Sequence, residues 1–281
     1  MFDPFITAVN AERASLTWFD NLTLNASNIY TPGFRERRMF FSDYLNGPDT
    51  VEHSYKAEQG KAIPGRAPSN LFVEGKGWFV VRSPEGKTLY TRLGDFKFDA
   101  KGTLVNELGH KVQGYITDDQ GKPLSTGAVQ ANPNGSPNNP NQSKGGTGAL
   151  ATTDITMWLD PANGKFFGKF DEYKVKSDGT VVGLANNGKN TVPLYKLAIV
   201  NFVSPESLSE VQDNYFIPNH LSGQPVEGTG EVRQGLIESS NTGLREIVNY
   251  LQQAKLQLDM TNKLITTNKQ LLQESLRLLS Q

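Results

Sequence analysis

The chain has 281 residues, 37% of them hydrophobic, so it can bury a sizeable core and has room for one to three domains. Its 28 Lys and Arg residues nearly balance 29 Asp and Glu residues, which argues against the basic surface that nucleic-acid binding requires. Cysteine is absent, which excludes disulfides, thiolate metal sites and cysteine nucleophiles.

The N-terminal segment predicts one long helix from residue 3 to about residue 30. Asp3 followed by Pro4 is a good helix start, because the Asp side chain can accept from free backbone amides and proline is tolerated at the first helical position. Pro32 and Gly33 end the pattern. Apolar residues recur at spacings of three, four and seven, at Phe5, Val9, Leu16, Phe19, Leu22, Ala26 and Ile29.

From Leu71 the pattern changes to short β-type runs separated by turn residues, which predicts consecutive antiparallel hairpins. Residues 125–150 are rich in Asn, Pro, Gly, Ser and Thr, a composition typical of a flexible surface insertion. The predicted strands cover residues 71–73, 78–81, 89–91, 96–98, 103–105, 112–116, 155–159, 173–175, 180–182 and 194–203.

The C-terminal segment predicts a second helix, which begins after the N-cap candidates in residues 239–241. Its length would be roughly 55 Å, longer than the β-rich part is wide. Apolar residues recur every seven positions, a pattern that indicates a partner helix. They are Leu244, Leu251, Leu258, Ile265, Leu272 and Leu279.

Two arrangements would cover the apolar stripes of these helices. They can pair antiparallel within one chain, or they can pack against other copies. Pairing within the chain leaves part of the longer C-terminal stripe uncovered, and uncovered apolar surface generally marks a partner. The predicted fold class is α+β: residues 1–41 and 239–281 form a coiled-coil-like helical layer, residues 42–70 are an extended connection, and residues 71–238 form a β-rich domain of antiparallel hairpins.

Three blocks of sequence then stand out, in order along the chain. They are NASNIYTPGFR at residues 25–35, FVEGKGWF and YTRLGDF within residues 72–96, and GLIESSN at residues 235–241. They resemble the Asn-x-x-Asn-x-x-Thr-x-Gly-Phe-Lys, Gly-x-Gly-Phe-Phe, Tyr-Thr-Arg-x-Gly-x-Phe and Gly-x-Leu-Glu-x-Ser-Asn signatures of bacterial flagellar rod and hook proteins. Tyr30, Trp78 and Thr242-Gly243 depart from these signatures, as does the Met-Phe-Asp-Pro opening, which leaves the paralogue open.

The resemblance implies a structural subunit with no enzymatic activity and no cofactor, which polymerises helically into a hollow, torque-transmitting shaft. The implied partners are copies of the chain, other flagellar rod and hook subunits, the flagellar export apparatus and the rings around the rod. The implied location is the periplasm-spanning basal body. Chain length favours a rod over a hook subunit, and the segment at residues 42–66 favours the distal over the proximal rod; proximal-rod and hook-type subunits stay alternatives.

The opening residues lack the basic region, apolar core and cleavage site of a secretory signal, so we expect export without a cleaved signal peptide. We also expect no membrane insertion. The predicted assembly interface combines helix positions with motif residues near the helix ends. It comprises Val9, Leu16, Phe19, Leu22, Asn25, Asn28, Ile29, Thr31, Pro32, Gly33, Phe34, Ser240, Asn241, Leu244, Leu251, Leu258, Ile265, Leu272 and Leu279.

Other function classes have weaker support. A secreted β-rich binding protein with a coiled-coil stalk would share the architecture. Residues 183–190 nearly match a phosphate-binding loop, but Asn190 stands where a Ser or Thr would contact magnesium, and a strand-like run follows. His53, His110 and His220 are scattered without metal-ligand spacing.

Overall fold

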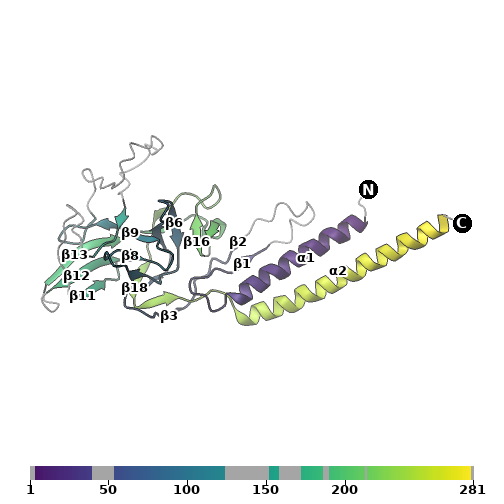
Figure 1. Cartoon of the computed structure of the whole chain (residues 1–281), viewed down its shortest axis with the longest axis horizontal. Coiled ribbons are helices and arrows are strands. Elements are labelled where there is room, and N and C mark those ends of the chain that lie inside the picture. Colours follow the sequence, from purple (N-terminus) through teal and green to yellow (C-terminus); the bar gives the residue numbers. More distant parts are fainter. Residues whose placement is uncertain are drawn as a thin grey trace.

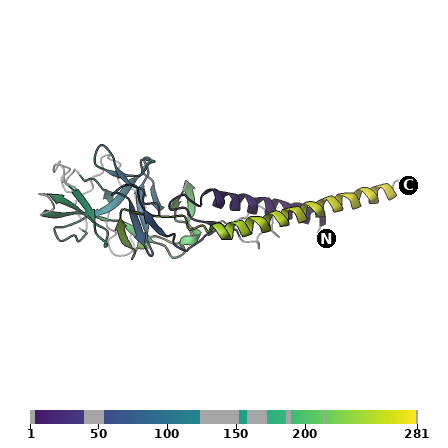
Figure 2. The same cartoon turned by 90° about the horizontal axis from the view of Figure 1, so that it is seen from below.

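The computed structural model describes residues 4–39, 54–123, 152–157, 172–185, 190–212 and 214–279. The molecule is elongated, with two helices at one end and a β-rich part at the other (Figures 1 and 2). We call the two helices the stalk, and the strands between residues 71 and 234 the body. The connecting residues 28–39, 54–64 and 236–243 are the neck.

The stalk consists of α1 (Pro4–Ser27) and α2 (Leu244–Leu279), which run antiparallel and side by side (Figures 1 and 2). At 1.5 Å per residue α1 is about 36 Å long and α2 about 54 Å. Because α1 ends at the neck and the longer α2 begins there, α2 extends beyond the start of α1 (Figure 1). The prediction of one helix near each end of the chain is confirmed.

The body is built from antiparallel strands. The principal path through its largest sheet has the order β11-β12-β13-β9-β5-β6-β16-β15, while β18 pairs with β4, and β19 with β3. A short 3-10 helix, η3 (Pro205–Ser207), precedes β15. The strands are β1 (Arg37–Arg38), β2 (Ser54–Tyr55), β3 (Ala62–Pro64), β4 (Leu71–Glu74), β5 (Trp78–Arg82), β6 (Thr88–Thr91), β7 (Lys97–Phe98), β8 (Leu104–Val105), β9 (Lys111–Ile116), β10 (Thr153–Asp154), β11 (Glu172–Val175), β12 (Thr180–Ala185), β13 (Asn190–Leu197), β14 (Ile199–Asn201), β15 (Ser209–Gln212), β16 (Tyr215–Ile217), β17 (Val226–Glu227), β18 (Glu231–Gln234) and β19 (Leu236–Glu238).

Two buried clusters of side chains form the core of the body. In the larger one, Phe79 packs edge-on against Phe96 with ring centroids 5.2 Å apart. In the smaller one, Trp78 meets Phe216 edge-on at 5.2 Å. Trp78 and Phe79 are consecutive residues of β5, so their side chains point to opposite faces of the strand, and β5 therefore contributes to both clusters.

The predicted run of consecutive hairpins is partly wrong. Hairpins β5–β6, β7–β8 and β11–β12–β13 form between sequence neighbours as expected. However, β4 pairs with β18 and β6 pairs with β16, because strands after residue 208 return to complete the body. The strand expected at residues 155–159 does not form over residues 155–157, because β10 ends at Asp154 and Ile155 is buried in the core; residues 158 and 159 lie outside the described residues. The proposed insertion at residues 125–150 lies outside the described residues.

Candidate functional site: the stalk and the neck

Several of the buried side chains on the two stalk helices are small or polar. Ala8, Ala14 and Ser15 are buried on α1, and Ala254 and Thr261 are buried on α2. The Ser15 and Thr261 hydroxyls donate to the backbone carbonyls four residues earlier, so neither needs a partner across the contact. Small side chains allow the helices to approach closely, whereas the large buried residues Leu22 and Ile247 lie where the stalk meets the neck.

A row of large apolar side chains on α2 stays in contact with solvent. We call this row the outer stripe; Leu264 is 59% exposed and Leu278 is 70% exposed. Its spacings of four and seven keep it on one helix face. That face is separate from the one that carries the half-buried Leu251, Leu258 and Ile265. The outer stripe comprises Leu256, Met260, Leu264, Leu271 and Leu278.

The distal end of α2 also exposes residues of the helix face that contacts α1. Leu272 is 53% exposed and Leu276 is 66% exposed. Their exposure follows from the unequal helix lengths, since α1 does not extend that far (Figure 1). The sequence-based expectation that self-pairing leaves part of the C-terminal stripe uncovered is therefore confirmed.

The two asparagines of the first sequence block, Asn25 and Asn28, form hydrogen bonds within this chain at the end of α1. Asn25 is buried, and its Nδ2 donates to the Arg37 carbonyl at 2.8 Å while its Oδ1 accepts from the Arg37 amide at 2.9 Å. Asn28 donates through Nδ2 to the Leu24 carbonyl and accepts from the Thr31 hydroxyl, both at 2.9 Å. These contacts end α1 and attach β1 to it.

The third sequence block is joined to the first in the neck. Gly33 adopts a positive φ of 68°, and its amide donates to the Glu238 carbonyl at 2.8 Å. The Asn241 side chain accepts from the Glu36 amide at 2.7 Å and donates to the Glu58 carbonyl at 2.8 Å. Asn241 therefore connects three separate segments of the chain at the point where α2 begins.

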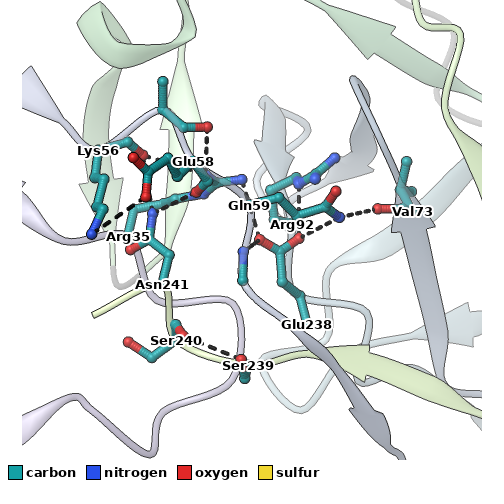
Figure 3. A network of polar contacts seen from close by, with 12 residues as sticks. Arg35, Lys56, Glu58, Gln59, Val73, Arg92, Glu238, Ser239, Ser240 and Asn241 are labelled. Carbon is teal, nitrogen blue, oxygen red and sulfur yellow. Dashed lines mark hydrogen bonds and ion pairs between the residues drawn. The ribbon is translucent and has the colours of Figure 1, made fainter. Parts of the chain in front are cut away.

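A buried network of charges joins all three sequence blocks (Figure 3). Glu238 is only 2% exposed, and its two carboxylate oxygens lie 3.3 Å from Arg35 Nη2 and 2.9 Å from Arg92 Nε. The Gly60 amide donates to the same carboxylate at 3.0 Å. Arg92 also donates to the carbonyl of Gly75 at 3.0 Å. One carboxylate thus connects the neck with the β4–β5 turn.

Burial and the Glu238 carboxylate have opposite effects on the pKa values of the two guanidinium groups in this network. Burial lowers the pKa of Arg35 to about 10, with Glu238 opposing the change and Arg92 adding to it. Burial also lowers the pKa of Arg92, again against the attraction of Glu238. The guanidinium of Arg35 lies 5.3 Å from the ring centroid of Trp78, a cation–π arrangement. Removing the Glu238 carboxylate would leave two positive charges buried without their shared counterion.

A second ionic group connects the neck to the first turn of α2. Lys56 Nζ lies 3.2 Å from Glu246 and 3.5 Å from each of Glu36 and Glu58. Burial lowers the pKa of Lys56, but the hydrogen bond with Glu246 and the three carboxylate charges outweigh it, so the pKa is raised. The acidic Glu246 is well placed near a helix N-terminus, where free amides favour negative charge.

A cavity of about 340 Å³ lies where the stalk meets the neck; we call it the base groove. Its walls combine apolar and charged groups from α1, α2 and the segment around β1. The lining residues are Trp18, Asn21, Leu22, Asn25, Glu36, Arg37, Arg38, Met39, Ile247 and Tyr250. A second cavity of about 230 Å³ lies beside Trp78 and Arg92.

The predicted interface residues fall into two groups in the structure. Leu22, Asn25, Gly33 and Phe34 are buried in or beside the neck, and Leu16, Leu244 and Leu272 are exposed. The side chain of Leu279 lies outside the described part. The half-buried members are Val9, Phe19, Asn28, Ile29, Thr31, Pro32, Ser240, Asn241, Leu251, Leu258 and Ile265. Their role in contacts between subunits stays a prediction.

Sequence reasoning missed the charged centre of the neck. Arg35, Arg92 and Glu238 each occur within a recognised block, but none was assigned to the candidate interface. A usable signal was present. Arg92 directly precedes Leu93 in a β-type run, and Glu238 directly follows Ile237 in another. Charged residues are rarely buried unless they are paired, so a charge next to such an apolar run suggests a partner. Such placement indicates a buried pair.

The catalytic patterns gain no support in the described part of the chain. Gly183 and Asn190 lie on β12 and β13, which pair with each other as antiparallel strands, unlike the strand-to-helix turn of a phosphate loop. His110 is buried and His220 is exposed, while His53 is outside the described residues. The described residues contain no cluster of three or more potential metal ligands, and none of their helices is long and apolar enough to cross a membrane.

Comparisons with known proteins find similarity to flagellar rod and hook proteins. The family model of the flagellar hook protein FlgE/F/G D1 domain matches residues 72–136. The flagellar basal-body rod protein FlgG of Caulobacter vibrioides is 26% identical, with 98% of each chain covered, and that of Borreliella burgdorferi is 24% identical, with 95% of this chain and 94% of the relative covered. The flagellar hook protein FlgE of Borreliella burgdorferi is 30% identical over 47% of this chain and 33% of its own length. The chain is therefore a homologue of the basal-body rod protein FlgG over nearly its whole length, and residues 72–136 match the D1 domain of the flagellar hook protein FlgE/F/G.

Proposed function

We propose that this protein is a structural subunit of the bacterial flagellar basal-body rod, which polymerises helically into a hollow, torque-transmitting shaft. Homology to FlgG over nearly the whole chain supports a rod subunit, whereas the match to the hook protein FlgE covers only 47% of the chain. A position in the distal rod is consistent with this homology. Its partners would be copies of itself and other rod and hook subunits.

The observation that carries this proposal is the outer stripe. Soluble monomers rarely leave a continuous row of large apolar side chains on a helix in solvent, and such rows generally mark contacts with other proteins. Here the row persists even though α2 already packs against α1 with a different face. In the assembled shaft the stalks would form a coiled-coil-like layer in which the outer stripe contacts neighbouring helices.

The shape of the molecule supports the same arrangement. The stalk and the body lie at opposite ends of an elongated particle (Figure 1). If stalks pack side by side, the bodies form a separate layer. A rotation and rise that do not close on themselves would repeat the same contact indefinitely and give a tube. We further propose that the subunit reaches this site through the flagellar export apparatus and lies within the rings that surround the rod.

Substitution in the outer stripe tests the proposal. We expect the double variant Leu264→Asp, Leu271→Asp to remain folded, because both side chains are exposed, and to lose polymerisation and swimming. Asn262→Asp is the matched control, since it adds a charge at an exposed polar position of the same helix. Leu251→Asp and Leu258→Asp also block assembly in this proposal, but those side chains are half-buried and the changes would disturb the stalk itself.

Sedimentation of the purified full-length chain gives the measurement. A rod subunit is expected to give monomers that convert to open polymers of no fixed size. A soluble oligomer of fixed subunit number would favour the secreted, stalked binding protein instead. Normal swimming by the double variant would contradict the proposal.

A further inference from the structure

We propose that the distal end of α2 in one subunit docks into the base groove of the next subunit. This inference rests on the proposed function and adds a specific contact to it. The distal end comprises the exposed residues Leu271, Leu272, Glu274, Leu276 and Leu278. The contact pairs two different surfaces of the same chain, so it is head-to-tail and repeats along the shaft.

The base groove offers an apolar floor with a cationic edge. Leu22 and Ile247 are buried at its floor, while Tyr250 on its wall is still 42% exposed. Arg38 lies at the groove with half of its side chain in solvent, and its one ion pair among the described residues, with Glu36, is long at 3.5 Å. Arg37 already pairs with Glu210 through its Nη2, so Arg38 is the more available of the two cations at the groove. The groove therefore has capacity for both aliphatic and anionic groups.

The distal end of α2 supplies both kinds of group. Four leucines project from the last three turns and contact solvent. Glu274 is exposed between them and makes no ion pair with the described residues. In addition, the last carbonyl groups of a helix lack intrahelical donors and carry partial negative charge, which the guanidinium group of Arg38 would complement.

The two surfaces cannot meet within one chain. Tyr250 at the groove and Leu278 at the distal end belong to the same helix, and 28 residues separate them, which corresponds to about 42 Å. A continuous helix cannot fold back over that distance. The distal end in the groove must therefore belong to a second copy. A contact between two different surfaces at opposite ends of the stalk can repeat and extend a filament.

Cysteine cross-linking tests this contact. Because the chain has no cysteine of its own, every disulfide must involve the introduced residues. We expect the double variant Tyr250→Cys, Leu278→Cys, polymerised and mildly oxidised, to give a ladder of covalent multimers on denaturing gels. Both positions are exposed in the monomer, so the substitutions should be tolerated. Each single variant, and the pair Tyr250→Cys, Val203→Cys with its second cysteine on the body, should give no ladder.

A charge exchange tests the pairing of Glu274 with Arg38. We expect Glu274→Arg and Arg38→Glu each to raise the critical concentration for polymerisation about tenfold, and the combined variant to restore it. Failure of the combined variant to recover, together with polymers that give no ladder, would overturn the docking while leaving the rod function intact. Failure of the unmodified chain to polymerise at all would instead count against the proposed function.

A further cysteine pair tests an alternative occupant of the base groove, namely the segment of the same chain that follows Met39. Tyr250→Cys combined with Tyr44→Cys reports whether the chain that follows Met39 lies in the groove. A disulfide within single chains for this pair, with no ladder for the pair at 250 and 278, would overturn the proposal.

Discussion

The neck and the distal end of α2 differ in where their side chains find partners. In the neck, Glu238 and Asn241 each bind several groups from distant parts of the same chain. At the distal end of α2, Leu271, Leu276 and Leu278 are each more than half exposed to solvent in the monomer. One region is complete within the subunit, and the other needs a neighbour. Stability and assembly should therefore respond to mutation in separate places.

The largest effect should come from the shared counterion of the neck. Glu238→Ala leaves Arg35 and Arg92 buried without a carboxylate, and we expect the free energy of unfolding to fall by about 3–5 kcal/mol. Urea denaturation followed by tryptophan fluorescence measures it. Glu74→Ala is the control, because its ion pair with Arg233 is half-exposed and should contribute less than about 1 kcal/mol. Equal losses in both variants would contradict the assignment.

A glycine of the second sequence block gives a comparable test in the body. At Gly94 a Cβ atom would lie 1.6 Å from the Leu71 carbonyl oxygen, so the backbone would have to move. We expect Gly94→Ala to destabilise the chain by about 3 kcal/mol, measured by the same denaturation. At Gly86 nothing lies within 4 Å, and only its positive φ of 85° opposes a side chain, so Gly86→Ala should cost about 1 kcal/mol.

A moderate effect is expected from overpacking the stalk contact. Ala254 is fully buried, and Ala254→Leu should push α1 away from α2 at a cost of about 1–3 kcal/mol to the stalk. We expect helical circular dichroism to melt at a lower temperature while the denaturation of the body is unchanged. Leu256→Ala, at an exposed position two residues away, is the control and should leave the helical melt unaltered.

The smallest effect concerns pH and is confined to the body. Burial lowers the pKa of His110, whose Nδ1 lies 3.2 Å from Asn106 Nδ2. Because the folded pKa is below the unfolded value, the unfolded chain binds the extra proton, and stability should fall as pH drops below about 6.5, by at most about 1.4 kcal/mol per pH unit. His110→Gln should flatten this slope between pH 7 and 5. A slope unchanged by the substitution would assign the pH dependence to other groups.

Much of the architecture could be predicted because it depends on local signals. Pro4, Pro32 and the heptad leucines define both helices, and turns such as residues 83–87 define hairpins between neighbouring strands. Pairings between distant segments could not be predicted. The strands β16 and β18 have short, mixed patterns, and their partners are chosen by the core that they complete rather than by their own residues.

The same reasoning explains the outcome for the candidate site. The predicted heptad row includes Leu251, Leu258 and Ile265, which are half-buried, whereas the exposed outer stripe lies on another face of α2 and was not predicted. The buried positions of the stalk also include Ala254 and Thr261, which carry little hydrophobic signal. Small residues become informative only when the close approach of two helices is known. The grouping of Arg35, Arg92 and Glu238 could not be predicted either, since the three residues come together from sites far apart in sequence.

Both chain ends lie toward the far tip of the stalk, away from the body (Figure 1). An affinity tag or fluorescent protein fused to either terminus would therefore lie where the stalks of neighbouring subunits have to pack in the proposed shaft. The turn at Gly86, which faces open solvent on the body, is the better insertion point for labelling functional rods in cells.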